Sequence, residues 1–282
     1  MTFPTFDFNG LEAVRLTAPD GAIAIVTCLG AQVVSWIPAG GSEQLYLSPR
    51  ARFESDTPIR GGVPLIFPQF ADNGPLPRHG FARTSAWEVT DIRQFEDSVI
   101  AVFTLNSDEV TEDLWPHRFR AEFTVAVSGS RLDLELDVEN TEEEGGPSFD
   151  FQAALHTYLK VKEVEQAPLT GLHGLRYRDR CDGQDKEDTG TELLVDDEVD
   201  RLYTNVRRPL MLQDGRRTVG LHHEGFSEMV VWNPWEYKCA ELDDMPPNGF
   251  RHMLCIEPAA VMQPIELAPG QNWWGRQTLV CL

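Results

Sequence analysis

Lysine, long apolar segments and paired cysteines are all scarce in this chain of 282 residues. Only four of its 24 basic residues are lysines, and its 45 acidic residues leave a formal net charge of −21. Such an acidic chain is not expected to bind nucleic acid or an anionic membrane, because contacts with a phosphate backbone depend on clustered basic residues. The basic residues present are mostly arginines, which suit fixed bidentate contacts with small anions.

Neither a membrane-spanning segment nor a secretory signal is evident. The longest charge-free apolar stretch around the middle of the chain, Gly61 to Ala71, contains two prolines and is far shorter than the roughly 20 residues that a spanning helix needs. The first ten residues, MTFPTFDFNG, lack a basic segment followed by an apolar run. We therefore expect a cytoplasmic protein without a membrane partner.

The five cysteines are scattered and include no C-x-x-C pair, which argues against both a disulfide framework and a zinc site. His222-His223-Glu224 is a weak metal candidate, because adjacent histidines on a strand point to opposite faces and no H-E-x-x-H spacing is present. The chain also has no Walker A motif, no G-x-G-x-x-G loop and no G-x-S-x-G motif. We expect no metal and no cofactor.

Hydrophobic periodicity predicts strands along most of the chain. Apolar and acidic residues alternate over 132–139, residues 121–127 have the same period of two, and Ser128 to Arg131 between them predicts a hairpin turn. Further apolar runs cover residues 22–28, 99–105, 229–232, 252–256 and 277–282. The best short helix candidate is Asp108 to Leu114, before Trp115-Pro116. The expected fold class is all-β, a sandwich of antiparallel sheets.

The chain shows no clear linker, and we expect residues 1–282 to form a single domain. An acid-rich segment, Arg176 to Asp200, has little apolar periodicity. This segment is interpreted as a long loop leading into a functional region, because long loops in compact domains are often functional or mobile.

Residues 58–83 reverse the charge of the chain locally. This window holds Arg60, Arg78 and Arg83 but a single acid, Asp72, and it also contains His79. Arginines of this kind can pair with surface carboxylates, but three of them among glycines, prolines and aromatic residues favour an anion site equally well.

Two further residues have ionisable side chains within apolar runs of the sequence. His156 lies in the run ALHTYL, where a histidine is either a hydrogen-bonded core residue or a functional one. Glu257 ends the run MLCIE and precedes a proline. A carboxylate there is costly unless it is partnered or used, and we expect Pro258 to end the strand and hold the acid at a rim.

Seven blocks in order give the chain a family resemblance. They are PIRGGVPLIFPQF, RHGFARTSAW, ALHTYLKV, EVDRLYTN, VVWNPW with a following lysine, CIEPA and LAPGQNWWGRQTLVCL. The chain resembles, over nearly its whole length, the glucose-6-phosphate 1-epimerases, the hexose-6-phosphate mutarotase branch of the aldose 1-epimerase superfamily. The resemblance implies a galactose mutarotase-like super-sandwich, no cofactor and a phosphosugar substrate whose α and β anomers are interconverted.

The same resemblance implies roles for individual residues. Glu257 would be the base toward the anomeric hydroxyl and His156 the acid toward the ring oxygen. Arg60 and Arg83 would bind the substrate and its phosphate, Asp200 would bind sugar hydroxyls, and His79 would line the pocket. The position of Arg78 is often glutamine in relatives, so Arg78 is a departure that strengthens phosphate binding or shifts substrate preference.

Trp232 and Trp235 are expected either in the pocket wall or in the core. Two alternative functions stay open: a mutarotase for unphosphorylated aldoses, and a non-catalytic carbohydrate-binding protein of the same fold. We expect a monomer.

Overall fold

The computed structural model describes residues 3–282, and strands dominate it. The strands form three sheets, and every pair of neighbouring strands in the described chain is antiparallel. The prediction of an all-β fold built from antiparallel sheets is confirmed. No helix among residues 3–282 has the length and apolar character needed to cross a membrane.

The three sheets have four, nine and eight strands. The four-stranded sheet contains β1 (Phe6–Phe8), β2 (Leu11–Thr17), β3 (Ile23–Thr27) and β4 (Val33–Ile37). The nine-stranded sheet has the order β15 (Glu192–Leu193), β12 (Leu169–Thr170), β17 (Leu210–Asp214), β18 (Arg217–Glu224), β21 (Asn272–Cys281), β9 (Arg131–Asn140), β8 (Phe119–Ser128), β7 (Val99–Asn106) and β6 (Glu88–Gln94).

The eight-stranded sheet carries the candidate site. Its order is β14 (Gln184–Glu187), β13 (Arg176–Asp179), β16 (Val199–Thr204), β19 (Glu228–Asn233), β20 (Met253–Leu267), β10 (Phe149–Leu155) and β5 (Leu65–Ile66), with β11 (Tyr158–Lys160) also paired to β20. The helical segments are short: α1 (Glu109–Leu114), α2 (Trp235–Ala240) and the 3₁₀ turns Ala82–Thr84, Val164–Gln166 and Gly249–His252.

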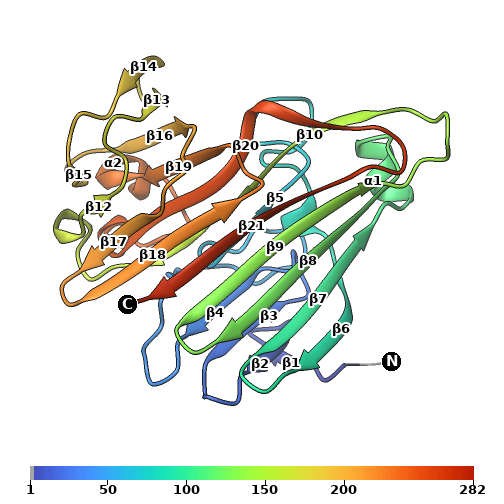
Figure 1. Cartoon of the computed structure of the whole chain (residues 1–282), viewed down its shortest axis with the longest axis horizontal. Coiled ribbons are helices and arrows are strands. Elements are labelled where there is room, and N and C mark those ends of the chain that lie inside the picture. The colour runs from blue at the N-terminus through green and yellow to red at the C-terminus, as the bar shows by residue number, and fades with distance from the viewer. Residues whose placement is uncertain (1–2) are drawn as a thin grey trace.

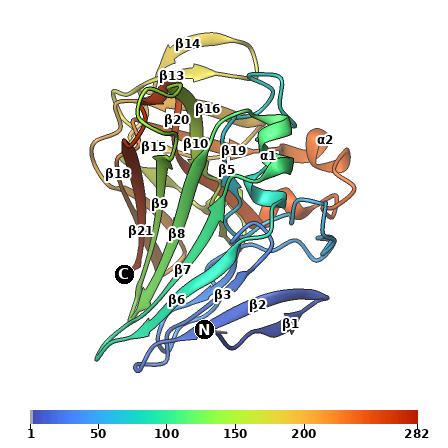
Figure 2. The same cartoon turned by 90° about the vertical axis from the view of Figure 1, so that its right-hand side faces the viewer.

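One face of the nine-stranded sheet packs against the other two sheets. Figure 1 shows β6 to β9 and β21 side by side in front of β3 and β4. The main core joins Phe123 and Leu134 of the nine-stranded sheet with Val26 of the four-stranded sheet and Phe151 of the eight-stranded sheet. In Figure 2, α2 projects on the side away from β18 and β21.

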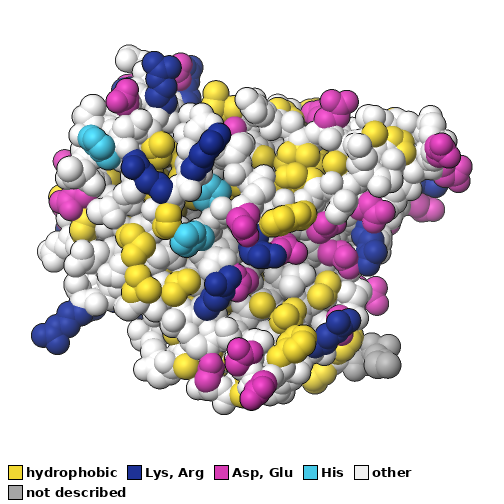
Figure 3. All heavy atoms as spheres, viewed as in Figure 1, with side chains coloured by type: hydrophobic (Ala, Val, Ile, Leu, Met, Phe, Trp, Pro, Cys, Tyr) yellow, Lys and Arg dark blue, Asp and Glu magenta, His cyan; other side chains and the backbone are white. Residues whose placement is uncertain are grey.

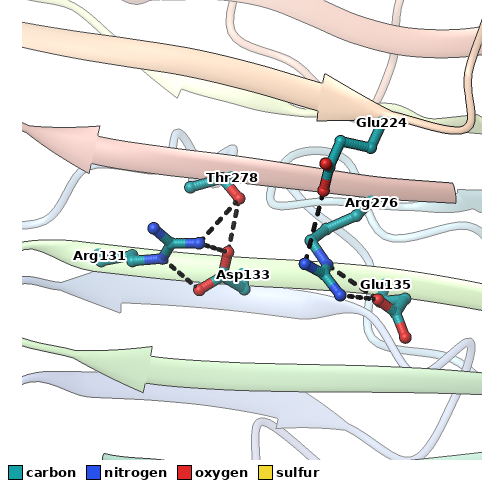
Figure 4. Close-up of polar contacts among 6 residues, drawn as sticks. All are labelled: Arg131, Asp133, Glu135, Glu224, Arg276 and Thr278. Atoms are coloured by element: carbon teal, nitrogen blue, oxygen red, sulfur yellow. Dashed lines mark hydrogen bonds and ion pairs between the residues drawn. The ribbon is translucent and has the colours of Figure 1, made fainter.

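The opposite face of the nine-stranded sheet carries many charged side chains that are partly exposed. Figure 3 shows acidic and basic side chains interspersed over it. Arg276 bonds Glu135 at 2.5 Å and lies 3.5 Å from Glu224, and Arg131 bonds Asp133 at 2.5 Å (Figure 4). Cross-strand pairing explains the contacts of Arg276, which lies opposite both glutamates in the registers of β9 and β18, whereas Arg131 and Asp133 lie two residues apart on the same side of β9.

The sequence patterns located most strands but misplaced one segment. The alternation over 132–139 lies within β9, and its hairpin with β8 closes where Ser128 pairs with Arg131. The interpretation of 176–200 as a long loop is wrong, because it contains β13, β14 and β15 and the start of β16. Ion pairs such as Arg178–Asp185, 3.2 Å apart, replace apolar alternation on the hairpin of β13 and β14, whose sides are mostly exposed.

Candidate active site

A pocket of about 260 Å³ lies on the face of the eight-stranded sheet that turns away from the main core. Strand alternation creates this face: Ile256 and Val231 belong to the core, whereas Glu257 and Trp232 point the other way and line the pocket. All eight residues singled out from the sequence line it: Arg60, Arg78, His79, Arg83, His156, Asp200, Trp232 and Glu257.

Glu257 lies in the middle of β20 and is 1% exposed. The expectation that Pro258 ends the strand and leaves the acid at a rim is wrong. Ile256 donates its N–H to Thr157, and backbone donors alternate sides along a strand. The backbone nitrogen of Pro258 therefore points to the same side as that of Ile256, toward the gap between β10 and β11. The hydrogen-bond ladder of β20 is interrupted at this gap, so the missing N–H of Pro258 breaks no bond there.

His156 occupies that gap. Its own N–H donates to the carbonyl of Pro64, and its ring stacks on Tyr158 with centroids 4.6 Å apart and an interplanar angle of 8°. Trp232 contacts the same ring edge-on, with centroids 5.8 Å apart. The imidazole is therefore held between aromatic side chains from two strands, directly beside Glu257.

The nitrogen Nδ1 of His156 lies 3.1 Å from Oε1 of Glu257. The two atoms are close but not aligned as a hydrogen bond, and neither His156 Nδ1 nor Glu257 Oε2 has a hydrogen-bond partner among residues 3–282. Burial is the main cause that lowers the pKa of His156 well below its usual value and raises that of Glu257 well above it. Both shifts favour uncharged forms, so the pair at rest keeps its proton on Glu257.

Arg60 is fixed from two sides. Its Nε donates to both carboxylate oxygens of Asp244 at 3.1 Å, and its Nη1 donates to Tyr158 Oη at 3.0 Å. Gly61, which follows it, has φ +114°, and a Cβ there would lie 2.3 Å from the carbonyl oxygen of Tyr46. A glycine is therefore required for the chain to turn Arg60 into the pocket.

Arg83 differs from Arg60 because no carboxylate among the described residues lies within ion-pair distance of it. Its Nη2 donates to the carbonyl of Arg78 at 2.6 Å, and its Nε has no hydrogen-bond partner in the described chain. Burial is the main cause that lowers the pKa of this guanidinium to about 10. Arg78 itself is exposed and pairs with Asp72. The half-buried Arg83 is thus a cation without a counter-anion.

His79 is buried beside Phe70, with ring centroids 5.1 Å apart. Ala71 donates its N–H to Nδ1 of His79 at 3.2 Å. Burial, reinforced by nearby arginines, lowers the pKa of His79 to about 2. The imidazole is therefore neutral and carries its proton on Nε2, which makes it a hydrogen-bond donor.

Asp200 lies beside Arg180, whose Nε is 3.8 Å from Asp200 Oδ1. Burial raises the pKa of Asp200, and Arg180 opposes that shift. Arg180 also lies over the ring of Phe70, 5.2 Å from its centroid. The sequence patterns did not reveal Arg180, since the hairpin that carries it has no apolar pattern, and they pointed to neither Tyr158 nor Asp244 as a pocket residue.

Two more residues come from the connection between β19 and β20. Lys238 of α2 lines the pocket and pairs with Glu198 at 2.7 Å. Trp235, which begins α2, is not among the lining residues and packs on Phe250 with centroids 5.0 Å apart. Of the two tryptophans expected in the wall or the core, Trp232 lines the pocket, whereas Trp235 packs beside it.

Three potential metal ligands lie close together, and two of them, His156 and Glu257, line the pocket. His156, Cys255 and Glu257 place their donor atoms within 4.8 Å of one another, and no other such group exists among residues 3–282. Burial raises the pKa of Cys255 well above its usual value. The donor set fits a metal poorly, because zinc prefers the thiolate. The absence of a resident metal or cofactor stays a prediction.

Comparison with known proteins places the chain in a family. Residues 12–279 match the model of the family described as aldose 1-epimerase. A "Putative glucose-6-phosphate 1-epimerase" of Cenchrus ciliaris is 34% identical, over 96% of this chain and 85% of the relative, and a protein of the same name from Escherichia coli K12 is 34% identical, over 82% and 77%.

The solved structures agree with these relatives. A crystal structure described as "a putative mutarotase" from Salmonella typhimurium superposes with a TM-score of 0.90 at 27% identity, covering 98% of this chain and 92% of that one. The expected mutarotase-like sandwich is confirmed by this superposition. The chain belongs to the aldose 1-epimerase family.

Proposed function

We propose that the protein interconverts the α and β anomers of a hexose 6-phosphate, with glucose 6-phosphate as the preferred candidate. Family membership supports carbohydrate epimerisation, and the names of the curated relatives support the phosphorylated substrate. The observation that carries the phosphate is Arg83, a half-buried guanidinium without a carboxylate partner in the described chain. A phosphate dianion would satisfy it, whereas an unphosphorylated sugar would not.

Ring opening needs two proton transfers at atoms bonded to the same carbon of the sugar. The Glu257 carboxylate takes the proton of the anomeric hydroxyl, and the C1–O1 bond becomes a double bond. The C1–O5 bond breaks with its electron pair moving to O5, which receives a proton from the His156 imidazolium. After rotation about C1–C2, the same steps in reverse close the ring on the other face.

The spacing of the two groups suits this chemistry. The anomeric oxygen and the ring oxygen are neighbours on C1, and His156 Nδ1 and Glu257 Oε1 are 3.1 Å apart. The working form needs the proton on His156 and the charge on Glu257. It contains the same number of protons as the resting pair and differs from it by one transfer.

The remaining lining residues would orient the sugar. Asp200 would accept hydrogen bonds from hydroxyls, and His79 would donate from Nε2. Trp232 would pack against the ring, Arg60 would join Arg83 at the phosphate, and Arg78 would add positive charge at the exposed rim. Orientation of this kind can contribute as much as the proton transfers do.

Selectivity between phosphorylated and free sugar tests the proposal. We expect Arg83→Ala to reduce anomer exchange of glucose 6-phosphate by about 100-fold, and that of glucose much less, since one charged contact is worth about 1.5–3 kcal/mol. Arg93→Ala is a matched control, because Arg93 is exposed on β6 and pairs only with Asp91 in the described chain. Equal losses on both sugars in Arg83→Ala would contradict the phosphate assignment and favour a mutarotase for unphosphorylated aldoses.

A non-catalytic sugar-binding protein is the second alternative. It predicts binding of glucose 6-phosphate by calorimetry with anomer exchange no faster than in buffer. His156 and Glu257, in contact on the pocket floor, support catalysis instead.

A further inference from the structure

We propose that a dianion held by Arg60 and Arg83 activates the His156–Glu257 pair, so that the phosphate of the substrate promotes ring opening in addition to anchoring the sugar. This inference rests on the proposed function. It follows from the way in which the pocket distributes its charged groups between the two members of the pair.

Arg60 is linked to the His156 side of the pocket. Its Nη1 donates to Tyr158 Oη at 3.0 Å, and the Tyr158 ring lies flat on the His156 ring with centroids 4.6 Å apart. The His79 ring contacts that of His156, with centroids 5.8 Å apart, and Arg83 lines the same pocket.

Glu257 has different neighbours. After burial, the groups that act on the pKa of Glu257 are Asp200 and Arg180, whereas those that act on the pKa of His156 are His79, Arg60 and Arg83. His156 is also enclosed by Tyr158 of β11 and Trp232 of β19, and neither carries a charge. Arg60 and Arg83 therefore disfavour protonation of His156 much more than they change the pKa of Glu257.

Of the two arginines, only Arg60 has a carboxylate in the described chain that neutralises its charge. Asp244 accepts both bonds from Arg60 Nε at 3.1 Å, but Arg83 has no carboxylate partner within the described residues. The positive charge of Arg83 is thus not neutralised by a described carboxylate, and it disfavours a proton on His156. A dianion bound beside Arg83 would reverse the sign of the net charge there.

The consequence for the pair is a change in where its one proton rests. Without an anion, burial and the arginines keep the proton on Glu257. With an anion beside Arg83, a proton on His156 becomes less unfavourable. Once the Glu257 carboxyl group aligns with His156 Nδ1, which lies 3.1 Å from Oε1, proton transfer yields the carboxylate base and the imidazolium acid. No proton has to enter or leave the pocket for this step.

The test separates the sugar from the anion. D-xylose offers the pyranose ring without C6 and its phosphate, and sulfate supplies a tetrahedral dianion that is a poor proton carrier at neutral pH. Anomer exchange of xylose is followed by NMR at constant ionic strength as sodium sulfate replaces sodium chloride, with protein-free blanks subtracted. We expect sulfate to raise kcat/KM for xylose saturably, by about tenfold or more.

Two variants show where the sulfate acts. Arg83→Ala is expected to abolish the sulfate response, whereas Arg93→Ala keeps it. A melting curve checks that each variant is folded. If Arg83→Ala does not fold, Arg83→Lys serves instead and should need a higher sulfate concentration for half-maximal activation, because lysine cannot make the bidentate contact.

A spectroscopic measurement tests the proton directly. In protein labelled with ¹⁵N-histidine, sulfate is expected to move the ring nitrogen signals of one residue toward imidazolium values, and His156→Gln identifies that residue by removing its signals. Unchanged His156 signals at saturating sulfate would overturn the inference.

The outcomes separate the inference from the proposed function. Exchange of glucose 6-phosphate well above the buffer rate, with sulfate leaving xylose exchange unchanged or inhibiting it, would overturn activation and retain the epimerase. Failure to accelerate exchange of any aldose or aldose phosphate would overturn the proposed function itself.

Discussion

Glu257 is 1% exposed, and its Oε2 has no hydrogen-bond partner among residues 3–282. A carboxyl group in this position is suited to proton transfer but unfavourable for folding once it ionises. Its pKa is raised by burial above the value in the unfolded chain. Stability therefore falls as the pH rises from about 4.5 toward the folded pKa, because the folded state binds the proton more tightly.

Glu257→Gln is accordingly expected to stabilise the fold while removing the proposed catalytic base. At pH 8 the free energy of unfolding should increase by about 1–3 kcal/mol, and the gain should shrink as the pH approaches 4.5. Urea unfolding of both proteins between pH 4.5 and pH 8 measures the difference. A variant less stable than wild type across this range would show that the ionised carboxylate is stabilised in the folded state.

His79 predicts the opposite pH dependence. The pKa of His79 is lowered to about 2 in the folded state. Below about pH 6.5, His79 therefore becomes protonated in the unfolded chain but stays neutral in the folded chain. The contribution of His79 to the free energy of unfolding is fully present above that pH. It decreases on acidification, by about 2 kcal/mol between pH 7 and pH 5.

His79→Asn removes this titration. Asparagine tolerates the φ of +69° at this position and can accept the Ala71 N–H. We expect its loss of stability between pH 7 and pH 5, from urea unfolding, to be about 2 kcal/mol smaller than that of wild type. Equal losses in the two proteins would mean that His79 is protonated in the folded state.

At the scale of elements, close backbone approaches hold the arginine loops against the sheets. Gly80 has φ +72°, and a Cβ there would lie 2.1 Å from the carbonyl oxygen of Phe67. Gly10, in the turn between β1 and β2, has φ +92°, and a Cβ added there would meet nothing within 4 Å. The two glycines share a φ that is unfavourable for other residues, but only at Gly80 would a side chain also clash.

Comparison of Gly80→Ala with Gly10→Ala isolates that contact. We expect Gly10→Ala to cost about 1 kcal/mol of stability, and Gly80→Ala about 3–5 kcal/mol, since the backbone on one side must move. Gly80→Ala should also weaken exchange of glucose 6-phosphate, because His79 and Arg83 flank the turn. Similar stabilities of the two variants would show that the loop can shift freely.

Most strands were predictable, since alternation such as that over 132–139 is a local signal. The charge reversal over 58–83 likewise singled out arginines that line the pocket, whereas Asp200 was reached only through the family resemblance. Three features were not predictable. The hairpin of β13 and β14 is stabilised by ion pairs and has no apolar period, α2 has only six residues, too few for a helical period, and Pro258 fits mid-strand only because β10 and β11 leave a gap beside it. The hairpin and Pro258 depend on pairing with strands distant in the sequence, whereas α2, unlike α1, has no capping side chain to mark where it begins.

For the whole molecule, the net charge of −21 and the pocket act on a phosphosugar at different distances. Arginines within contact distance attract the dianion strongly, whereas surface carboxylates beyond about 8 Å are screened at physiological salt. The acidic surface is thus expected to slow the approach of the substrate more than it weakens binding.

Added salt should relieve this repulsion. We expect kcat/KM for glucose 6-phosphate to rise about two- to fivefold between 10 and 150 mM ionic strength, while that for glucose stays constant. Sodium chloride and potassium acetate are compared so that competition by one anion is recognised. A steady decrease with salt for glucose 6-phosphate would show that the local positive charge dominates the approach as well.

Catalysis of anomer exchange of a hexose 6-phosphate through His156 and Glu257 is open to one direct measurement, exchange spectroscopy on [1-¹³C]glucose 6-phosphate with and without protein. We predict cross-peaks between the α and β anomeric signals that grow in proportion to protein concentration. Folded His156→Ala and Glu257→Gln should each lose about 10²–10⁴-fold in exchange rate. Exchange at the buffer rate with bound sugar, or most activity retained in either variant, would contradict this mechanism.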